Sequence, residues 1–439
     1  MRKMVVLFCS TTALCMPHAA CAQSDELSGS LSQLYNVAQQ HNATLQRCQA
    51  AINEAQAAIE TARMSKLPDI TGQASVSYIG NARLWNRQFG ESTGAPMPHY
   101  GNNFLLRAEQ VIYTGGAIKG GIELAQQNAR MQQLSAQSEV QRVRYMLTSL
   151  YLQLHSLRNQ QQVYNTHISL AEQQIDLMKK RRQQGVSLRN DVTRYELQLQ
   201  QLKLALATVT DQQSIWIKQL YTALGTDSLQ FQALGDEAFA ERTILAKGED
   251  EWQQLAMKQH LGLQQSQLAI SMSQTKERIT RAERLPKIAV IAEDHLDGPI
   301  TIEVPPINKN LNYWYVGLGV SYNFSSLFKT KRKMRQAQLA TTLAQSELVD
   351  LQQKVGDAVH SAYVNLQTAR TQLLSHQKSV QLAAENYEVV SKRYENGLAL
   401  ITDLTDAANV RLESELSLAN ARINLVFCYY SLKYAAHLL

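Results

Sequence analysis

The longest uninterrupted pattern of hydrophobic and polar positions covers residues 329–394, which contain no proline and are rich in strong helix formers. This pattern predicts one helix of roughly 100 Å, and residues 119–182 predict a second of similar length. Each carries an apolar stripe in steps of three and four, as in a coiled-coil seam. The stripes are Val355, Val359, Ala362, Leu366 and Ala369, and Val143, Leu147, Leu150, Leu154 and Leu157. Helices of this length exceed a compact domain, so the pattern indicates an elongated architecture.

Shorter helical patterns and four segments of period-two alternation surround the long helices. The shorter helices are expected at residues 31–65, 191–223, 252–281 and 403–439, and the strands at residues 70–78, 103–113, 287–296 and 312–324. The last strand alternates most clearly, with Trp314, Val316 and Leu318 on one face and Tyr315, Gly317 and Gly319 on the other. A length of about 9–11 residues suits a tilted strand in a membrane.

The order of these elements occurs twice along the chain. Leu285-Pro286 follows Leu67-Pro68 by 218 positions, and Gly397 follows Gly185 by 212. Nearly constant spacing over a whole unit indicates an internal repeat. We therefore expect a first repeat at residues 23–225 with a β-hairpin at 69–113, a linker at 226–250, and a second repeat at 251–439 with a hairpin at 286–324.

The N-terminus has the pattern of a secretory signal peptide. Within residues 1–22, Arg2 and Lys3 precede an apolar core, and Ala20-Cys21-Ala22 fits the small-x-small cleavage rule. Lipidation at Cys21 is a second interpretation of the same segment. Outside it remain Cys48 and Cys428, for which a disulfide and two buried thiols both stay open, with buried thiols favoured.

Composition narrows the class of function. The chain has 439 residues, 18% charged residues, a net charge of +6 that is small for this length, and no nucleic-acid-binding motif, so we expect no nucleic-acid partner. No phosphate loop, nucleophile elbow or metal-ligand spacing of His and Cys is present in the sequence. We therefore expect no enzyme, no cofactor and no metal.

The strands require a surface to cover their apolar faces. In a soluble protein the sheet would pack against a helix, but the flanking helices are too long to fold back over it. Aromatic residues at both ends of the last strand, Trp314 and Tyr322, resemble the interfacial girdles of membrane barrels. Four strands cannot close a barrel alone, so several copies would have to contribute to one barrel in outer-membrane lipid.

At this level the chain resembles the TolC-like outer-membrane efflux protein family. The resemblance rests on the duplicated plan, on the motif that ends in Gly115-Gly116, and on the turns at residues 185–191 and 393–406. It implies a mainly α fold with membrane β structure: a duplicated helix–β-hairpin–helix unit, and a trimeric 12-stranded outer-membrane β-barrel continuous with a long periplasmic α-helical barrel. The implied function is a passive exit duct for small molecules such as drugs in a tripartite efflux or type I secretion system. The alternative is a periplasmic structural coiled coil without pore activity. The implied partners are two sister copies, a periplasmic adaptor and an inner-membrane pump.

The resemblance also implies site residues in the two turns. Asp403 and Asp406 would ring the periplasmic end and favour cations, and Asn190, Asp191 and Tyr394 would link neighbouring helix pairs as a gate. Asp191 and Asp403 also suit a simpler role as acidic residues in the first turn of a helix. The family's prototype has an arginine where this chain has Ala399, so Arg189 or Arg393 would have to substitute for it. The adaptor would contact the tips at Gly185, Val186, Gly397 and Leu398.

Overall fold

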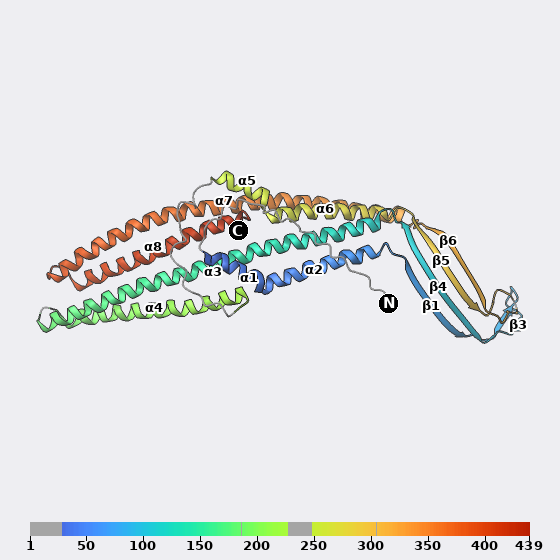
Figure 1. Cartoon of the computed structure of the whole chain (residues 1–439), viewed down its shortest axis with the longest axis horizontal. Helices are drawn as coiled ribbons and strands as arrows, with labels where there is room; N and C mark the ends of the chain where they lie inside the picture. The colour runs from blue at the N-terminus through green and yellow to red at the C-terminus, as the bar shows by residue number, and fades with distance from the viewer. Residues whose placement is uncertain (1–28, 186, 227–247, 304) are drawn as a thin grey trace, which may run out of the picture.

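The molecule is a bundle of long helices with a β-sheet projecting from one end (Figure 1). The computed structural model describes residues 29–185, 187–226, 248–303 and 305–439. The expected signal peptide at residues 1–22 and most of the expected linker at 226–250 lie outside these ranges. Within them, no helix holds an apolar stretch of the length that a bilayer crossing requires.

Two very long helices organise the bundle, as the sequence predicts. Helix α3 (Ala117–Gln183) has 67 residues and α7 (Ser326–Glu395) has 70. Their apolar stripes are buried, with Leu147 and Val359 fully inaccessible to solvent. The remaining helices are α1 (Gly29–His41), α2 (Ala43–Met64), α4 (Arg189–Leu224), α5 (Glu249–Gln259), α6 (Leu261–Ala282) and α8 (Ile401–Ala435). Helix α3 packs along α2, α4, α6 and α8, so it holds both halves of the chain together.

The prediction of single helices over residues 31–65 and 252–281 was wrong, because each range holds two helices. The first breaks at Asn42 and the second at His260, where the backbone is extended with ψ of 122° and 114°. Asn42 accepts a hydrogen bond from the Leu45 N–H, and His260 accepts one from the Gly262 N–H, so each side chain caps the helix that follows. The two breaks are 218 positions apart, as are the two Leu-Pro pairs.

The two expected hairpins join into one sheet. Strands β1 (Asp69–Tyr78), β4 (Tyr100–Tyr113), β5 (Lys287–Gly298) and β6 (Leu311–Ser321) pair in the order β1-β4-β5-β6, all antiparallel. The contact between hairpins is the β4–β5 pair, in which Ala108 lies opposite Ala292. Between β1 and β4, where no strand was predicted, the chain forms a small hairpin of β2 (Ala82–Trp85) and β3 (Ser92–Ala95).

The sheet has one apolar face that nothing in the described chain covers. In register, β6 aligns Val316, Leu318 and Val320 on this face, and each is at least 63% exposed. Every residue of β1 is exposed, and the helices run away from the sheet (Figure 1). The soluble arrangement, with the sheet packed against a helix, is therefore contradicted.

The two cysteines that the structure describes are free. Cys48 and Cys428 are both partly exposed rather than buried, and no disulfide joins them. Burial is still sufficient to raise the pKa of the Cys428 thiol.

Candidate functional site

The two helix–helix turns lie at the end of the molecule opposite the sheet (Figure 1). A cluster of buried side chains from α3, α4 and α8 holds them together, with Met178, Tyr195 and Leu404 almost fully buried. Gly185 and Gly397 end the long helices with φ of 79° and 73°. This left-handed conformation strains most residues with a Cβ, so glycine is favoured at both turns.

Asp191 and Asp403 have the first-turn role that the sequence predicts. The Leu188 N–H donates to Asp191 Oδ2 at 3.2 Å, and the Leu400 N–H donates to Asp403 Oδ2 at 3.0 Å. Each carboxylate therefore satisfies an otherwise free donor at the start of α4 or α8 and complements the positive helix end. This role fixes both side chains at the tip of the molecule.

Tyr394 lies where α7 meets the α3–α4 turn. Burial raises the pKa of its phenol, and the Asp191 carboxylate nearby adds to the rise, so the hydroxyl stays protonated at neutral pH. The structure thus brings Asp191 and Tyr394 together within one chain. Asn190 is exposed beside them, and Asp406 is exposed one turn after Asp403.

The arginine that contacts Tyr394 is Arg181, which was not among the residues predicted from the sequence. Arg181, in the last turn of α3, donates from Nη2 to the Glu395 carbonyl oxygen at 2.5 Å, and its guanidinium lies 5.9 Å from the centre of the Tyr394 ring. The expected substitutes lie elsewhere: Arg393 reaches the Leu398 carbonyl of its own turn at 3.4 Å, and Arg189 is exposed at the start of α4. The only sequence signal for Arg181 was its membership of a basic run before the tip.

The tips present apolar side chains to solvent. Leu188, Leu398 and Leu400 are 71%, 68% and 70% exposed. Of the expected contact residues, Leu398 belongs to this surface and Val186 lies outside the described residues. Leu188 and Leu400, which the sequence analysis did not single out, precede α4 and α8 at matching positions.

A polar link joins α3 to α8 farther from the tips. His167 is 7% exposed, and its Nε2 lies 3.0 Å from Glu415 Oε2, while Arg411 Nε donates to Glu415 Oε1 at 2.9 Å. The His167 hydrogen bond is the main reason why the pKa of Glu415 is lowered. His167 and Glu415 lie in different halves of the chain, so no local sequence pattern predicts this pair.

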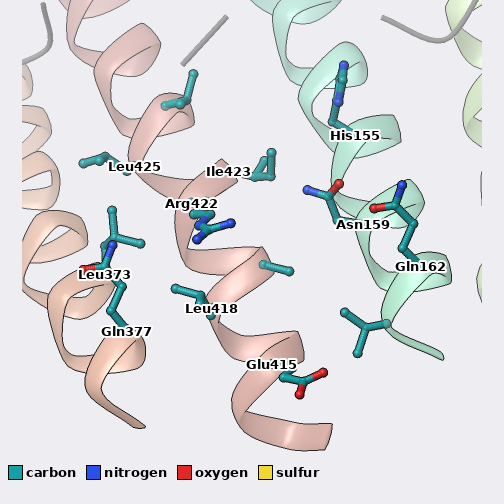
Figure 2. Close-up of a pocket in the computed structure, with 13 residues that line it drawn as sticks. His155, Asn159, Gln162, Leu373, Gln377, Glu415, Leu418, Arg422, Ile423 and Leu425 are labelled. Atoms are coloured by element: carbon teal, nitrogen blue, oxygen red, sulfur yellow. The ribbon is translucent and has the colours of Figure 1, made fainter. Parts of the chain in front are cut away.

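Next to this link, α3 separates from the α7–α8 pair around a cavity of about 670 Å³ (Figure 2). His155 and Asn159 of α3 face Arg422 of α8 across it, and Leu373 and Gln377 come from α7. Within the described residues, no group of three or more His, Cys, Asp and Glu side chains could hold a metal ion. Neither the cavity nor the tip has the arrangement of a catalytic site.

Comparison with known proteins identifies the family. The profile of the family described as "Outer membrane efflux protein" matches residues 34–226 and 252–430. The chain belongs to the outer membrane efflux protein family. This outer membrane efflux protein is 21% identical over 415 residues to the outer membrane efflux protein BepC of Brucella suis biovar 1 (strain 1330), covering 94% of this chain and 85% of BepC.

Solved structures agree on the fold of this outer membrane efflux protein. The outer membrane protein VceC from Vibrio cholerae matches with a TM-score of 0.74 at 13% identity, over 93% of this chain and 96% of VceC. CusC matches with a TM-score of 0.77 at 14% identity, over 92% and 91%. The outer-membrane channel OprN matches with a TM-score of 0.75 at 14% identity, over 93% and 90%.

Family membership decides between the expected functions. The protein is an exit duct of efflux systems in the Gram-negative outer membrane, with an extension into the periplasm, and it is not an enzyme. The alternative of a structural coiled coil without a pore is therefore wrong. The TolC-like resemblance and the mainly helical fold with a projecting sheet are confirmed.

Proposed function

We propose that three copies of this chain form the duct, with a 12-stranded barrel in the membrane and a helical barrel in the periplasm. The observation that carries this proposal is the pair of free sheet edges at β1 and β6. In an all-antiparallel sheet of four strands, the two edge strands run in opposite directions. The β6 edge of one copy therefore suits antiparallel pairing with the β1 edge of the next. Closure would satisfy every edge and place the apolar face toward lipid.

Disulfide crosslinking across the new edge tests this proposal. In a chain with Cys48 and Cys428 replaced by serine, Ser75→Cys on β1 is combined with Gly317→Cys or Gly319→Cys on β6, which lie on the same face as Ser75. We expect oxidation of one combination to give covalent trimers in outer-membrane fractions. The control is Ser75→Cys with Asn103→Cys, which are direct partners within one chain and should give only monomers on denaturing gels. A monomer for every β1–β6 combination, together with a monomeric native protein, would refute the trimer.

We further propose that the tips form the periplasmic gate. Asp403 and Asp406 of three copies would ring the narrow end and favour cations, since both side chains are exposed beside the turn. The contact of Arg181 with the Tyr394 ring, next to the Asp191 carboxylate and the exposed Asn190, would hold the helix pairs in the closed arrangement.

The apolar tips support docking of a periplasmic adaptor, which would connect the duct to an inner-membrane pump. Exposed leucines next to a tight glycine turn offer a small surface on which another helical tip can bury apolar area. The expected contacts are Gly185, Val186, Gly397 and Leu398, joined by Leu188 and Leu400. Small molecules such as drugs are the proposed cargo, and a type I secretion substrate is the alternative.

We infer that the chain arose as a duplicated unit, with repeats at 23–225 and 251–439. The matching helix breaks support this inference, because Asn42 and His260 have the same spacing as the two Leu-Pro pairs.

A further inference from the structure

The face of the sheet opposite to the apolar one carries a connected polar network. Its members come from three adjacent strands, so they are far apart in sequence but close in space. They are Arg107, Glu109, Glu293, His295, Asp297 and Tyr315. In a barrel whose apolar face meets lipid, this network faces the lumen.

Glu293 is the centre of the network. Its Oε1 lies 3.3 Å from Arg107 Nη1, and its Oε2 accepts hydrogen bonds from the Tyr315 hydroxyl at 2.6 Å and from His295 Nε2 at 2.9 Å. Arg107 also donates to Glu109 at 2.8 Å. These partners cover the carboxylate, which is only 10% exposed, so the network holds each charge in a fixed place.

The network continues toward the outer end of the sheet. His295 stacks on Tyr313 with 4.7 Å between ring centres, and its Nδ1 lies 3.7 Å from Asp297 Oδ2. Asn103 donates to Asp297 at 2.5 Å from the neighbouring strand. At 3.3–3.4 Å per residue, Glu293 lies roughly 20 Å along β5 from its helical end, so the network extends from the middle of the barrel wall, at Glu109 and Glu293, to its outer part at Asp297.

The network is negatively charged. Three carboxylates and one guanidinium leave two negative charges per copy while His295 is neutral. The other charged groups of this face on the four strands are Asp69, which lies opposite Glu109 on β1, and Lys287, which lies at the helical end of β5; their opposite charges leave the sum unchanged. In three copies, six net negative charges would surround the outer part of the lumen.

We propose that this network is a second charge filter, which makes the outer mouth of the duct favour cationic cargo over anionic cargo. The inference rests on the proposed trimeric barrel and deepens it by assigning a substrate class. The outer filter acts independently of the periplasmic ring of Asp403 and Asp406, because it lies at the opposite end of the molecule. Glu109 and Asp297 supply its most accessible negative charge, and Arg107 reduces it.

Reversal potentials of the full-length protein in planar bilayers, under a KCl gradient, test the filter. The background carries Asp403→Asn and Asp406→Asn, which remove the periplasmic ring, so the remaining selectivity reports the barrel. We expect this background to remain cation-selective. Adding Glu109→Gln with Asp297→Asn should lower the potassium-to-chloride permeability ratio about threefold, allowing for screening by salt. Adding Arg107→Gln instead should raise the ratio.

Asp294→Asn is the matched control. Asp294 is adjacent to Glu293 but lies on the apolar face, where Asn312 donates to it at 2.9 Å, so its neutralisation should leave the ratio unchanged. If the variants of Glu109, Asp297 and Arg107 conduct but leave the potassium-to-chloride permeability ratio unchanged, the filter is overturned while the proposed duct stands. An effect of Asp294→Asn as large as that of the double variant would also overturn it, because the faces would be reversed. If neither the native protein nor any variant conducts ions, both the filter and the proposed duct are overturned.

Discussion

Removal of the Arg181 side chain should open the proposed gate. In the structure Arg181 ties α3 to the end of α7 through the Glu395 carbonyl at 2.5 Å and the Tyr394 ring at 5.9 Å. A charge-assisted hydrogen bond at a partly exposed position contributes about 1 kcal/mol, and a cation–π contact about 0.5 kcal/mol. Arg181→Ala should therefore cost the closed state about 1.5 kcal/mol per copy, or about tenfold in the closed-to-open ratio. If three copies open together, the ratio would change about a thousandfold.

Single-channel recording in planar bilayers measures this change as a higher resting conductance or open probability. Arg182→Ala is the control, since Arg182 is the exposed neighbour and its replacement removes the same charge. Arg181→Lys should lie between the native protein and Arg181→Ala, because lysine keeps the charge but not the planar donor group. Equal resting conductance for Arg181→Ala and the native protein would show that the contacts at this tip do not hold the duct closed.

Two further predictions concern stability. Gly397→Ala should destabilise the tip by about 1 kcal/mol, because the backbone of Gly397 is left-handed. Gly356→Ala within α7, where a Cβ has room, should stabilise the helix by a similar amount. The thermal unfolding temperatures of the two variants should therefore shift in opposite directions, and a shift in the same direction would contradict the strain argument. Burial, with His437 nearby, lowers the pKa of His260 from 6.5 to about 4. Between pH 4 and pH 6.5 the unfolded chain therefore binds more protons than the folded chain. The free energy of unfolding should fall as the pH drops from about 6.5 to 4. This loss of stability should be about 1–2 kcal/mol after allowance for solvent exposure. In denaturant unfolding, His260→Asn should remove this part of the pH dependence. The same slope of stability against pH in the variant and the native protein would refute the assignment to His260.

The sequence was sufficient for the elements whose signals are local. The stripes of Leu147 and Val359, the period-two strands and the glycine turns each depend on residues close together in the chain. The structure confirmed them, and the first-turn bonds of Asp191 and Asp403 followed from position alone.

What the sequence did not predict depends on contacts between distant residues. The break at Asn42 exists because its side chain is buried and donates to the Ala223 carbonyl at 2.6 Å, a partner 181 residues away. Helix propensity alone imposes only a small penalty at an asparagine, too small to predict a break. The β4–β5 pairing and the contact of Arg181 with Glu395 likewise join the two halves of the chain, and no periodicity within either half specifies them.

The joining of the two hairpins through β4 and β5 has a mechanical consequence. At that end a continuous backbone ladder unites the halves of the chain, whereas at the tips they meet through a few side chains. Ladders yield only by breaking many bonds in concert, but side-chain contacts yield one at a time. Any widening of the molecule should therefore begin at the tips and decrease toward the membrane, with the sheet acting as the fixed end.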